Sequence, residues 1–423
     1  MTLDLQRLRP RGPLKVFPCS KEALVTPRAV IRIGLVFMVG VLAACGQSGG
    51  ARPEGGRPDQ TQNAFLDPSH PGPYLAGNTS FVFEDPGRLL SCGAGKRRLV
   101  TEVWYPAADE AVGWPENRMS DFFLDQFEAA VEALRQSGQL PDGEFHDFTT
   151  GSFRDAPVHP DAPAMPILIF SHGFSSNRFQ NYTMCNYLAG HGYLVVSPDH
   201  TCNAKIAPLP EGIVLFTWSN ALASLSERMD DMSFLIDVFT GDPPEKFEGR
   251  LDPERIGFWG HSYGGMTVTE QLKVEPRVSA MLQMASFGFP FPPVPEGLSA
   301  ATLFMWGEQD KVMTPFENLH DEVVSQMPVP KYELEFLDTG HFAFSDLCVF
   351  LDFLLMELDG CGRGTRIATG EPFENPDHGE MHQILNAYAT AFFGASFFGY
   401  SELSDYMREN HFPDRVRYNS MVN

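Results

Sequence analysis

The stretch that decides the fold is RIGFWGHSYGGMTVTEQL, residues 255–272. Its first five residues are typical of a buried strand, and the run from Met266 to Leu272 is typical of a helix. Between them lies Gly260-x-Ser262-x-Gly264. A sharp strand-to-helix turn crowds backbone against backbone, so small residues are needed two positions before and two after the serine. Because free N–H groups at the start of a helix favour negative charge, the pattern predicts that Ser262 is a nucleophile.

A serine hydroxyl is a poor nucleophile at neutral pH and needs a base, together with a group that orients the base. His341 follows the strand expected at 332–337, and Asp310 follows the strand expected at 302–306. Both lie just past the carboxyl end of a strand, the edge where ligands bind in open α/β sheets. We predict that His341 is the base and that Asp310 orients it. The alternatives are Glu308 as the acid, or structural roles for both residues in turns or loops.

The segment Ser171-His172-Gly173-Phe174 follows another apolar strand, expected at 166–170. Attack by the serine on a carbonyl would create an oxyanion, which two backbone N–H groups can stabilise. We assign these donors to Phe174 and Tyr263. Gly173 would let the backbone approach a substrate closely.

Four other histidines are given no catalytic role. His172 is interpreted as structural because His341 already serves as the base, and His200 is assigned to packing or to a loop. His378 and His382 lie four residues apart, which could place them on one helical face. Without a Glu beside the first histidine and without a third ligand, surface or packing roles are favoured over a metal site. No metal and no cofactor are therefore expected.

Apolar strands alternate with segments long enough for helices throughout the body of the chain. Strands are expected at 80–83, 98–105, 166–170, 193–197, 255–259, 278–284, 302–306 and 332–337, and helices at 121–137, 181–190, 221–239 and 266–272. Continuous apolar strands that alternate with helices predict an α/β fold, with a mostly parallel central sheet and helices on both faces. Residues 107–160 are predicted to form a helical insertion before the core that bears the nucleophile.

Together these segments resemble the α/β-hydrolase superfamily, and within it the platelet-activating-factor acetylhydrolase family and its bacterial dienelactone-hydrolase-like relatives. The resemblance covers about residues 80–395 and rests on FSHGFSSNR (170–178), LAGHGYLVVSPDH (188–200), IGFWGHSYGGMTV (256–268) and GHF (340–342). One departure stands out. The animal acetylhydrolases carry their acid just after the strand that follows the nucleophile helix, where this chain reads MASFGFPF (284–291). The acid here is therefore expected one strand later, at Asp310.

The resemblance implies a serine hydrolase that cleaves carboxylic esters, on short-acyl or lipid-like substrates. The loop Phe287–Phe291 and the segment Ile213–Trp218 are candidates for an acyl pocket, and plain core packing is the alternative for both. Two other functions stay open. One is a serine peptidase or amidase with the same triad, and the other is a non-catalytic lipid-binding envelope protein on a hydrolase scaffold.

The N-terminus is expected to direct export. Residues 1–44 end in a short apolar run, too short to span a bilayer comfortably, that fits the core of a secretory signal. Leu42-Ala43-Ala44-Cys45-Gly46 resembles the bacterial lipobox, in which the cysteine becomes lipid-modified. An ordinary cleaved signal or a signal anchor is the alternative. Residues 45–75 are expected to form a flexible tether, and residues 76–423 the catalytic domain. The resemblance implies a lipid-anchored protein of the bacterial envelope, on the periplasmic side of the outer membrane.

The formal net charge is −23, and the expected signal contributes +5 of it, so its removal would leave −28. Such a surface repels nucleic acid, which is excluded as a partner. Five cysteines remain beyond Cys45. An exported compartment permits disulfides, and proximity in the sequence suggests Cys348–Cys361 and Cys185–Cys202, with Cys92 free, although connectivity does not follow from sequence.

Overall fold

The structure is a computed structural model that describes residues 67–138, 147–217, 224–350 and 358–422. The expected signal, the anchor Cys45, most of the tether and Trp218 of the proposed acyl segment lie outside the described residues. All that follows concerns the body of the chain from Asp67 onward.

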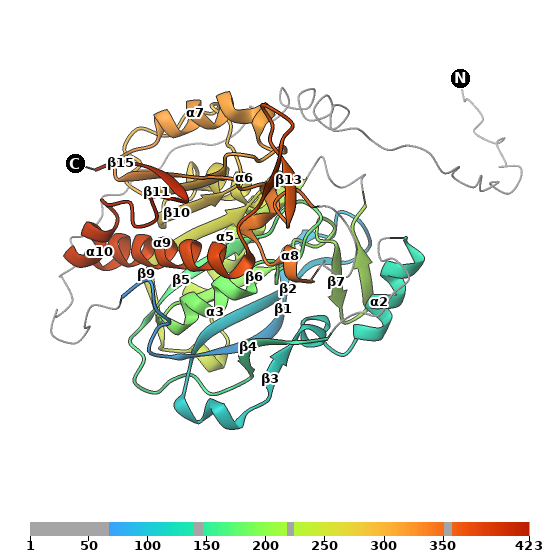
Figure 1. Cartoon of the computed structure of the whole chain (residues 1–423). Helices are drawn as coiled ribbons and strands as arrows, with labels where there is room; N and C mark the ends of the chain where they lie inside the picture. The colour runs from blue at the N-terminus through green and yellow to red at the C-terminus, as the bar shows by residue number, and fades with distance from the viewer. Residues whose placement is uncertain (1–66, 139–146, 218–223, 351–357, 423) are drawn as a thin grey trace, which may run out of the picture. The chain divides into compact units, whose positions relative to one another are not determined.

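The body is built around an 11-stranded sheet with the order β15-β12-β11-β10-β9-β5-β6-β2-β1-β4-β3 (Figure 1). The strands are, in chain order, β1 (Leu75–Leu89), β2 (Lys96–Ala107), β3 (Glu116–Arg118), β4 (Thr149–Arg154), β5 (Met165–Ser171), β6 (Leu194–Pro198), β9 (Leu251–His261), β10 (Val278–Met284), β11 (Ala301–Gly307), β12 (Lys331–Phe336) and β15 (Val416–Met421). The six neighbouring strands β6, β5, β9, β10, β11 and β12 pair in parallel. The predicted mostly parallel α/β sheet is therefore confirmed.

Helices cover both faces of this sheet, as predicted. On β5, Leu168 and Phe170 join one apolar cluster, whereas Ile167 and Ile169 join another. This alternation shows that the central strands are buried on both sides. The first cluster packs under α3 (Tyr182–Gly190) and α9 (His378–Phe398), and the second under α5 (Ser224–Gly241), α6 (Tyr263–Leu272) and α7 (Glu317–Gln326).

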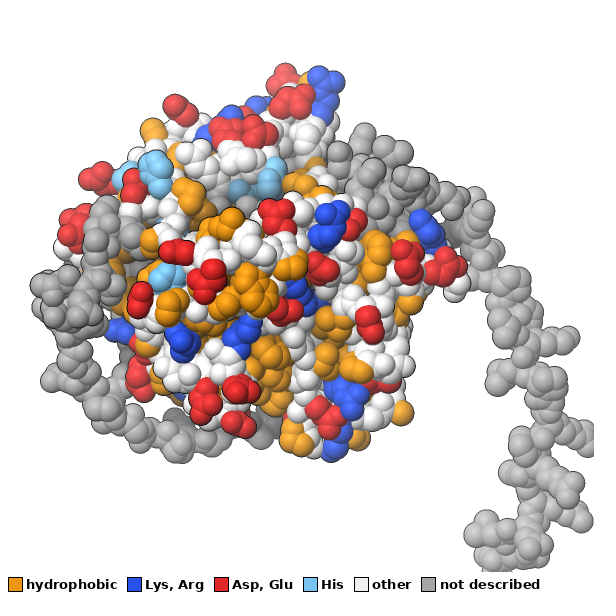
Figure 2. All heavy atoms as spheres, turned by 90° about the horizontal axis from the view of Figure 1, so that it is seen from below, with side chains coloured by type: hydrophobic (Ala, Val, Ile, Leu, Met, Phe, Trp, Pro, Cys, Tyr) orange, Lys and Arg blue, Asp and Glu red, His pale blue; other side chains and the backbone are white. Residues whose placement is uncertain are grey.

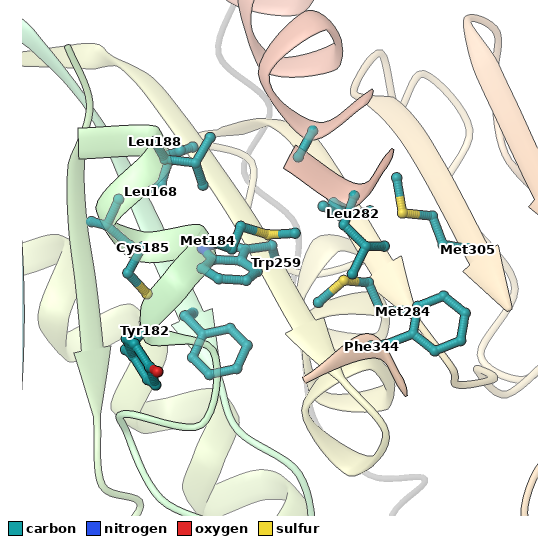
Figure 3. Packing of buried hydrophobic residues seen from close by; sticks show 14 of the residues in the cluster. Leu168, Tyr182, Met184, Cys185, Leu188, Trp259, Leu282, Met284, Met305 and Phe344 are labelled. Atoms are coloured by element: carbon teal, nitrogen blue, oxygen red, sulfur yellow. The ribbon is translucent and has the colours of Figure 1, made fainter. Parts of the chain in front are cut away.

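Figure 3 shows the first cluster from close by. Met184 and Leu188 of α3 approach Trp259 of β9, and Leu282 of β10 lies beyond it. Trp259 is fully buried. Packing around Trp259 thus fixes the last residues of β9, the strand that leads directly to the predicted nucleophile.

The predicted insertion differs from the structure in two respects. The helix expected at 121–137 is broken into a 3₁₀ turn, Met119–Phe123, and helix α2, Phe127–Gln136. Leu124 between them has φ = 57°, a left-handed conformation that ends the first segment. The insertion is also not purely helical, because β4 pairs with β1, and β3 with β4, at the edge of the sheet.

Several shorter elements complete the described body. They are the hairpin β7 (Ile206–Leu209) and β8 (Gly212–Leu215), the pair β13 (Arg363–Thr365) and β14 (Pro372–Glu374), helices α8 (Leu347–Phe350) and α10 (Ser401–Tyr406), and 3₁₀ turns at Asp109–Gly113, Glu245–Phe247, Thr314–Phe316 and His341–Phe344. In the part of the chain that the structure describes, no helix is long and apolar enough to cross a membrane. Figure 2 shows a face on which acidic, basic and apolar side chains are interspersed.

The cysteine pairing predicted from proximity is half wrong. Cys348 pairs with Cys361 as expected, but Cys202 pairs with Cys92, and Cys185 is a buried free thiol. The reason is the sheet register. β2 runs antiparallel to β6, with Thr101 opposite Pro198, so the turn before β2 and the loop after β6 meet at one end of the sheet. Cys185 instead points into the apolar cluster from α3 (Figure 3).

Loss of the Cys92–Cys202 bond is expected to destabilise the protein strongly. The two cysteines are 110 residues apart in the sequence. Closing a loop of this length lowers the conformational entropy of the unfolded state, which stabilises the folded state by about 4–5 kcal/mol. Urea unfolding of the variant with Cys92→Ser and Cys202→Ser should therefore show a free energy of unfolding lower by about 3–5 kcal/mol. The matched variant with Cys348→Ser and Cys361→Ser, whose bond spans only 13 residues, should lose less. Equal losses in the two variants would contradict the prediction.

Candidate active site

The predicted nucleophile lies on a strained turn between β9 and α6. Ser262 has φ = 56° and ψ = −124°, a conformation that non-glycine residues rarely adopt. The glycines around it are required by contact. A Cβ on Gly260 would overlap the carbonyl of Gly264, and a Cβ on Gly264 would overlap the carbonyl of Ser171. The packing of β9, α6 and β5 thus leaves no room for a side chain at positions 260 and 264.

The structure brings the three predicted catalytic side chains into one hydrogen-bonded chain. Ser262 Oγ lies 2.9 Å from His341 Nε2, and His341 Nδ1 lies 2.8 Å from Asp310 Oδ2. Asp310 and His341 are buried, at 2% exposure each, whereas Ser262 is half-buried. The arrangement places an oriented imidazole against a hydroxyl that a ligand can reach.

The backbone selects Asp310 over its competitor. Asp310 Oδ1 accepts hydrogen bonds from the N–H groups of Val312 and Met313, at 2.9 and 2.8 Å, which leaves Oδ2 for the histidine. Glu308 is engaged elsewhere, because its carboxylate accepts hydrogen bonds from Arg417 and from the N–H of Asp338. Glu308 is therefore not the acid of this chain of hydrogen bonds.

The loop predicted to stabilise an oxyanion lies against the nucleophile. A Cβ on Gly173 would be 3.5 Å from Ser262 Cβ, and Phe174 is the next residue. Tyr263 is the first residue of α6, where helical N–H groups have no partner within the helix. Both predicted donors thus belong to backbone that borders Ser262. Their role as donors stays a prediction.

Two residues that the sequence analysis did not assign connect this loop to the base. Gln180 Oε1 accepts from the N–H of Gly173 at 2.7 Å, and Gln180 Nε2 donates to His261 Nδ1 at 2.6 Å. His261 Nε2 in turn donates to the backbone carbonyl of His341, at 3.0 Å. This directionality requires a neutral His261, and burial lowers its pKa to about 3. These hydrogen bonds join the loop of Gly173 and Phe174, called the oxyanion loop for its predicted role, to the turn that carries His341, called the base loop.

A neutral, buried His261 makes the protein sensitive to acid. Below about pH 6.5, the ordinary pKa of histidine, the unfolded chain binds a proton at this residue while the folded chain does not. The free energy of unfolding should then fall with decreasing pH, by at most about 1.4 kcal/mol per pH unit for this group. Urea unfolding between neutral pH and about pH 4.5 should give a shallower fall in a His261→Asn variant. Parallel curves would mean that His261 is not held neutral.

A second hydrogen-bonded set of the same residue types lies behind the oxyanion loop. Ser171 Oγ is 3.0 Å from His200 Nε2, and His200 Nδ1 is 2.9 Å from Asp231 Oδ2. All three are fully buried, and burial lowers the pKa of His200 to about 3. Arg228 donates to Ser171 Oγ and to the carbonyl of His172. The set anchors the start of the oxyanion loop and is closed to ligands.

His172 also has a structural place, as predicted. Its Nε2 accepts from the N–H of His200, at 3.1 Å, and its Nδ1 donates to the carbonyl of Gly173, at 2.7 Å. The ring is completely buried, and burial lowers its pKa well below the ordinary value. His172 therefore holds the backbone of the oxyanion loop without contact to the reacting groups.

Aromatic side chains from the two proposed acyl-pocket segments lie next to residues that border the nucleophile. Phe216 lies edge-on to the ring of Phe174, with centroids 5.0 Å apart, and Phe174 is 37% exposed. On the other side, Ser286 Oγ donates to the carbonyl of Ser262, and the adjacent Phe287 stacks on Phe316. Both segments thus border the site, although the far end of the first lies outside the described residues.

The fold and the site define a class. A mostly parallel sheet with a serine on a tight turn after one strand, an acid after a later strand and a histidine after the next is the α/β-hydrolase fold. The chain therefore has the α/β-hydrolase fold.

Comparison with known proteins finds similarity to acetylhydrolases and esterases over parts of the chain. Residues 92–208 match the model of the family described as platelet-activating factor acetylhydrolase, isoform II. The chain is similar to a platelet-activating factor acetylhydrolase of Cavia porcellus, 23% identical over 261 residues that cover 53% of this chain and 56% of that protein. It is also similar to a probable 1-alkyl-2-acetylglycerophosphocholine esterase of Arthroderma benhamiae, 28% identical over 129 residues, 29% of this chain and 31% of that one.

These alignments are partial: the chain spans about half the length of the first relative and less than a third of the second. The family model includes the oxyanion loop and ends before Ser262. Among solved structures, a ferulic acid esterase from Streptomyces cinnamoneus superimposes with a TM-score of 0.62, covering 82% of this chain and 96% of that one at 23% identity. At this identity the likeness shows the fold.

Proposed function

We propose that this protein is a serine hydrolase of carboxylic esters. The observation that carries the proposal is the chain Ser262–His341–Asp310, with contacts of 2.9 and 2.8 Å and a serine on a strained turn. The names of the three similar proteins support the bond type, because each is called an acetylhydrolase or an esterase.

In the first half of the proposed reaction, Ser262 Oγ attacks the ester carbonyl carbon while His341 Nε2 takes the hydroxyl proton. The carbonyl oxygen becomes an oxyanion, and the N–H groups of Phe174 and Tyr263 stabilise it. His341 then gives the proton to the leaving alcohol, and an acyl-serine remains. Asp310 accepts the Nδ1 proton of His341 in a hydrogen bond throughout, which stabilises the imidazolium.

In the second half, His341 takes a proton from water, and the hydroxide attacks the acyl carbon. The tetrahedral intermediate collapses, its Ser262 oxygen regains the proton from the histidine, and the acid leaves. Every proton in this scheme is carried by the chain's own residues.

Short-acyl or lipid-like esters are the proposed substrates. The aromatic residues Phe174, Phe216 and Phe287 lie in or against the loops next to the nucleophile, so an apolar acyl or alcohol group would find contact there. The first two similar proteins are named for acetylated lipids, which supports the same direction.

The test is hydrolysis of a series of p-nitrophenyl esters, from acetate to palmitate, with labelling by a fluorophosphonate as a second readout. We expect hydrolysis that is fastest with short acyl groups, and labelling that Ser262→Ala abolishes. A maximum at palmitate would overturn the short-acyl part alone. Labelling without ester hydrolysis would favour the peptidase or amidase function, and neither labelling nor hydrolysis would favour the binding-protein function.

We further propose that the chain is exported and anchored through Cys45 to the envelope of a bacterium. The lipobox-like segment supports this, and two disulfides in the body are compatible with an oxidising compartment. Labelling of cells with a fatty-acid analogue should mark the protein, and Cys45→Ser should remove the label and release the protein from membranes. Unchanged labelling in that variant would refute the anchor.

A further inference from the structure

Behind the active site, two histidines of one helix point at a buried carboxylate. Asp346 follows the turn that carries His341, and α9 begins at His378, with His382 one turn later (Figure 1). His378 Nε2 is 2.7 Å and His382 Nε2 is 3.4 Å from the same oxygen, Asp346 Oδ1. One ligand atom from each residue can be chosen so that all lie within 4.8 Å of one another.

One member of the cluster, His382, is poorly satisfied by hydrogen bonds. Asp346 is fully buried and His382 is 3% exposed, yet neither ring nitrogen of His382 has a hydrogen-bond partner. Among the described residues, the ion pairs of Asp346 are with these two histidines, and none is with a lysine or arginine. A buried imidazole without a hydrogen bond costs free energy unless its ring nitrogens find a better partner than the 3.4 Å contact with Asp346.

We propose that Asp346, His378 and His382 bind a divalent transition-metal ion, with Zn²⁺ as the best match. Two imidazole nitrogens and one carboxylate oxygen form a donor set that Zn²⁺ accepts readily. Ligand atoms at about 2.0–2.1 Å from a tetrahedral ion lie about 3.3 Å apart, and the separations of 2.7 and 3.4 Å from Asp346 Oδ1 require only a small shift of His378. His378 is partly exposed, so water can complete the fourth position.

The surroundings favour a structural site. Asp346 Oδ2 accepts from the N–H of Thr183 at 2.9 Å, which orients the carboxylate as an outer-shell partner does. The N–H of Asp346 donates to the carbonyl of Gln180, the residue whose side chain holds the oxyanion loop. A bound ion would therefore join α3, α9 and the base loop at one point. It would act through positioning and would take no part in the reaction.

The test is the binding of Zn²⁺ by the full chain once EDTA has removed any metal already bound. We expect one Zn²⁺ per chain by elemental analysis and a higher thermal unfolding midpoint with Zn²⁺ than with EDTA. The His378→Ala variant should bind zinc at least about 100-fold more weakly, since loss of even an outer-shell contact can cost that much. The matched control is His70→Ala, which removes an exposed histidine that pairs with a single carboxylate, Asp67, at 3.0 Å. This variant should bind zinc normally.

Three results would overturn the proposal: no stoichiometric zinc in the unaltered chain, zinc that does not change the unfolding midpoint, or equal binding by the His378→Ala and unaltered chains. If His378→Ala fails to fold, the comparison of the unaltered chain with Zn²⁺ and with EDTA still decides. None of these measurements depends on ester hydrolysis, so they are independent of the proposed function.

Discussion

Ser262→Ala is expected to lower kcat for ester hydrolysis by about 10⁶-fold, to the level that binding and the oxyanion loop provide alone. The hydroxyl is the only group at this position that can form the acyl intermediate, and its hydrogen bond in the structure is to His341. Alanine keeps a Cβ of the same size on the same strained backbone. The variant should therefore fold with a thermal unfolding midpoint close to that of the parent.

The measurement is single-turnover and steady-state hydrolysis of p-nitrophenyl acetate beside thermal unfolding. The matched control is Ser279→Ala, the same chemical change on β10, where the hydroxyl donates to the backbone carbonyl of Ile256 at 3.4 Å. Its activity should stay within a few-fold of the parent. Residual activity of Ser262→Ala above about one thousandth of the parent would assign the nucleophile elsewhere.

Asp310→Asn is expected to lower kcat by about 10⁴-fold while the fold stays intact. The N–H groups of Val312 and Met313 both donate to Asp310 Oδ1, so an asparagine must place its carbonyl oxygen there and turn its amide N–H groups toward His341. An amide donor facing Nδ1 forces the proton of the ring onto Nε2. The histidine can then no longer accept the proton of Ser262.

Glu308→Gln is the matched control, because it removes the same charge two residues earlier. Its carboxylate pairs with Arg417 at the surface, and exposed pairs contribute about 0–1 kcal/mol. Steady-state kcat of this variant should change by no more than a few-fold. A large loss of kcat in Glu308→Gln together with a near-normal Asp310→Asn would contradict the prediction and assign the acid to Glu308.

The parallel core could be predicted because its strands are continuous apolar runs. The strand expected at 278–284 coincides with β10. Helix α9 gave no comparable signal. It is apolar almost all round because it is buried over most of its length, and such a helix has no 3.6-residue period to detect. The break at Leu124 was equally hidden, since residues 121–137 carry a helical pattern through the position where the backbone turns left-handed.

That Ser262, His341 and Asp310 lie together could be predicted because each is tied to a strand end, which is a local feature of the sequence. The supporting residues could not. Gln180 acts on Gly173 nearby but also on His261, 81 residues away, and that contact exists only once the sheet is assembled. The Cys92–Cys202 pairing could not be predicted for the same reason, because the two cysteines, 110 residues apart, meet only when β2 pairs with β6.

The buried Ser171–His200–Asp231 set shows that reactivity in this molecule is decided by access. The same three functional groups, at nearly the same separations, occur twice within one sheet edge. One serine is open to an electrophile and the other is sealed on every side. A serine-reactive inhibitor is therefore expected to react with Ser262 and not with Ser171, although each serine lies within hydrogen-bond distance of a histidine that contacts an aspartate. The difference in exposure between Ser171 and Ser262 separates the structural role of the inner set from the proposed catalytic role of the outer one.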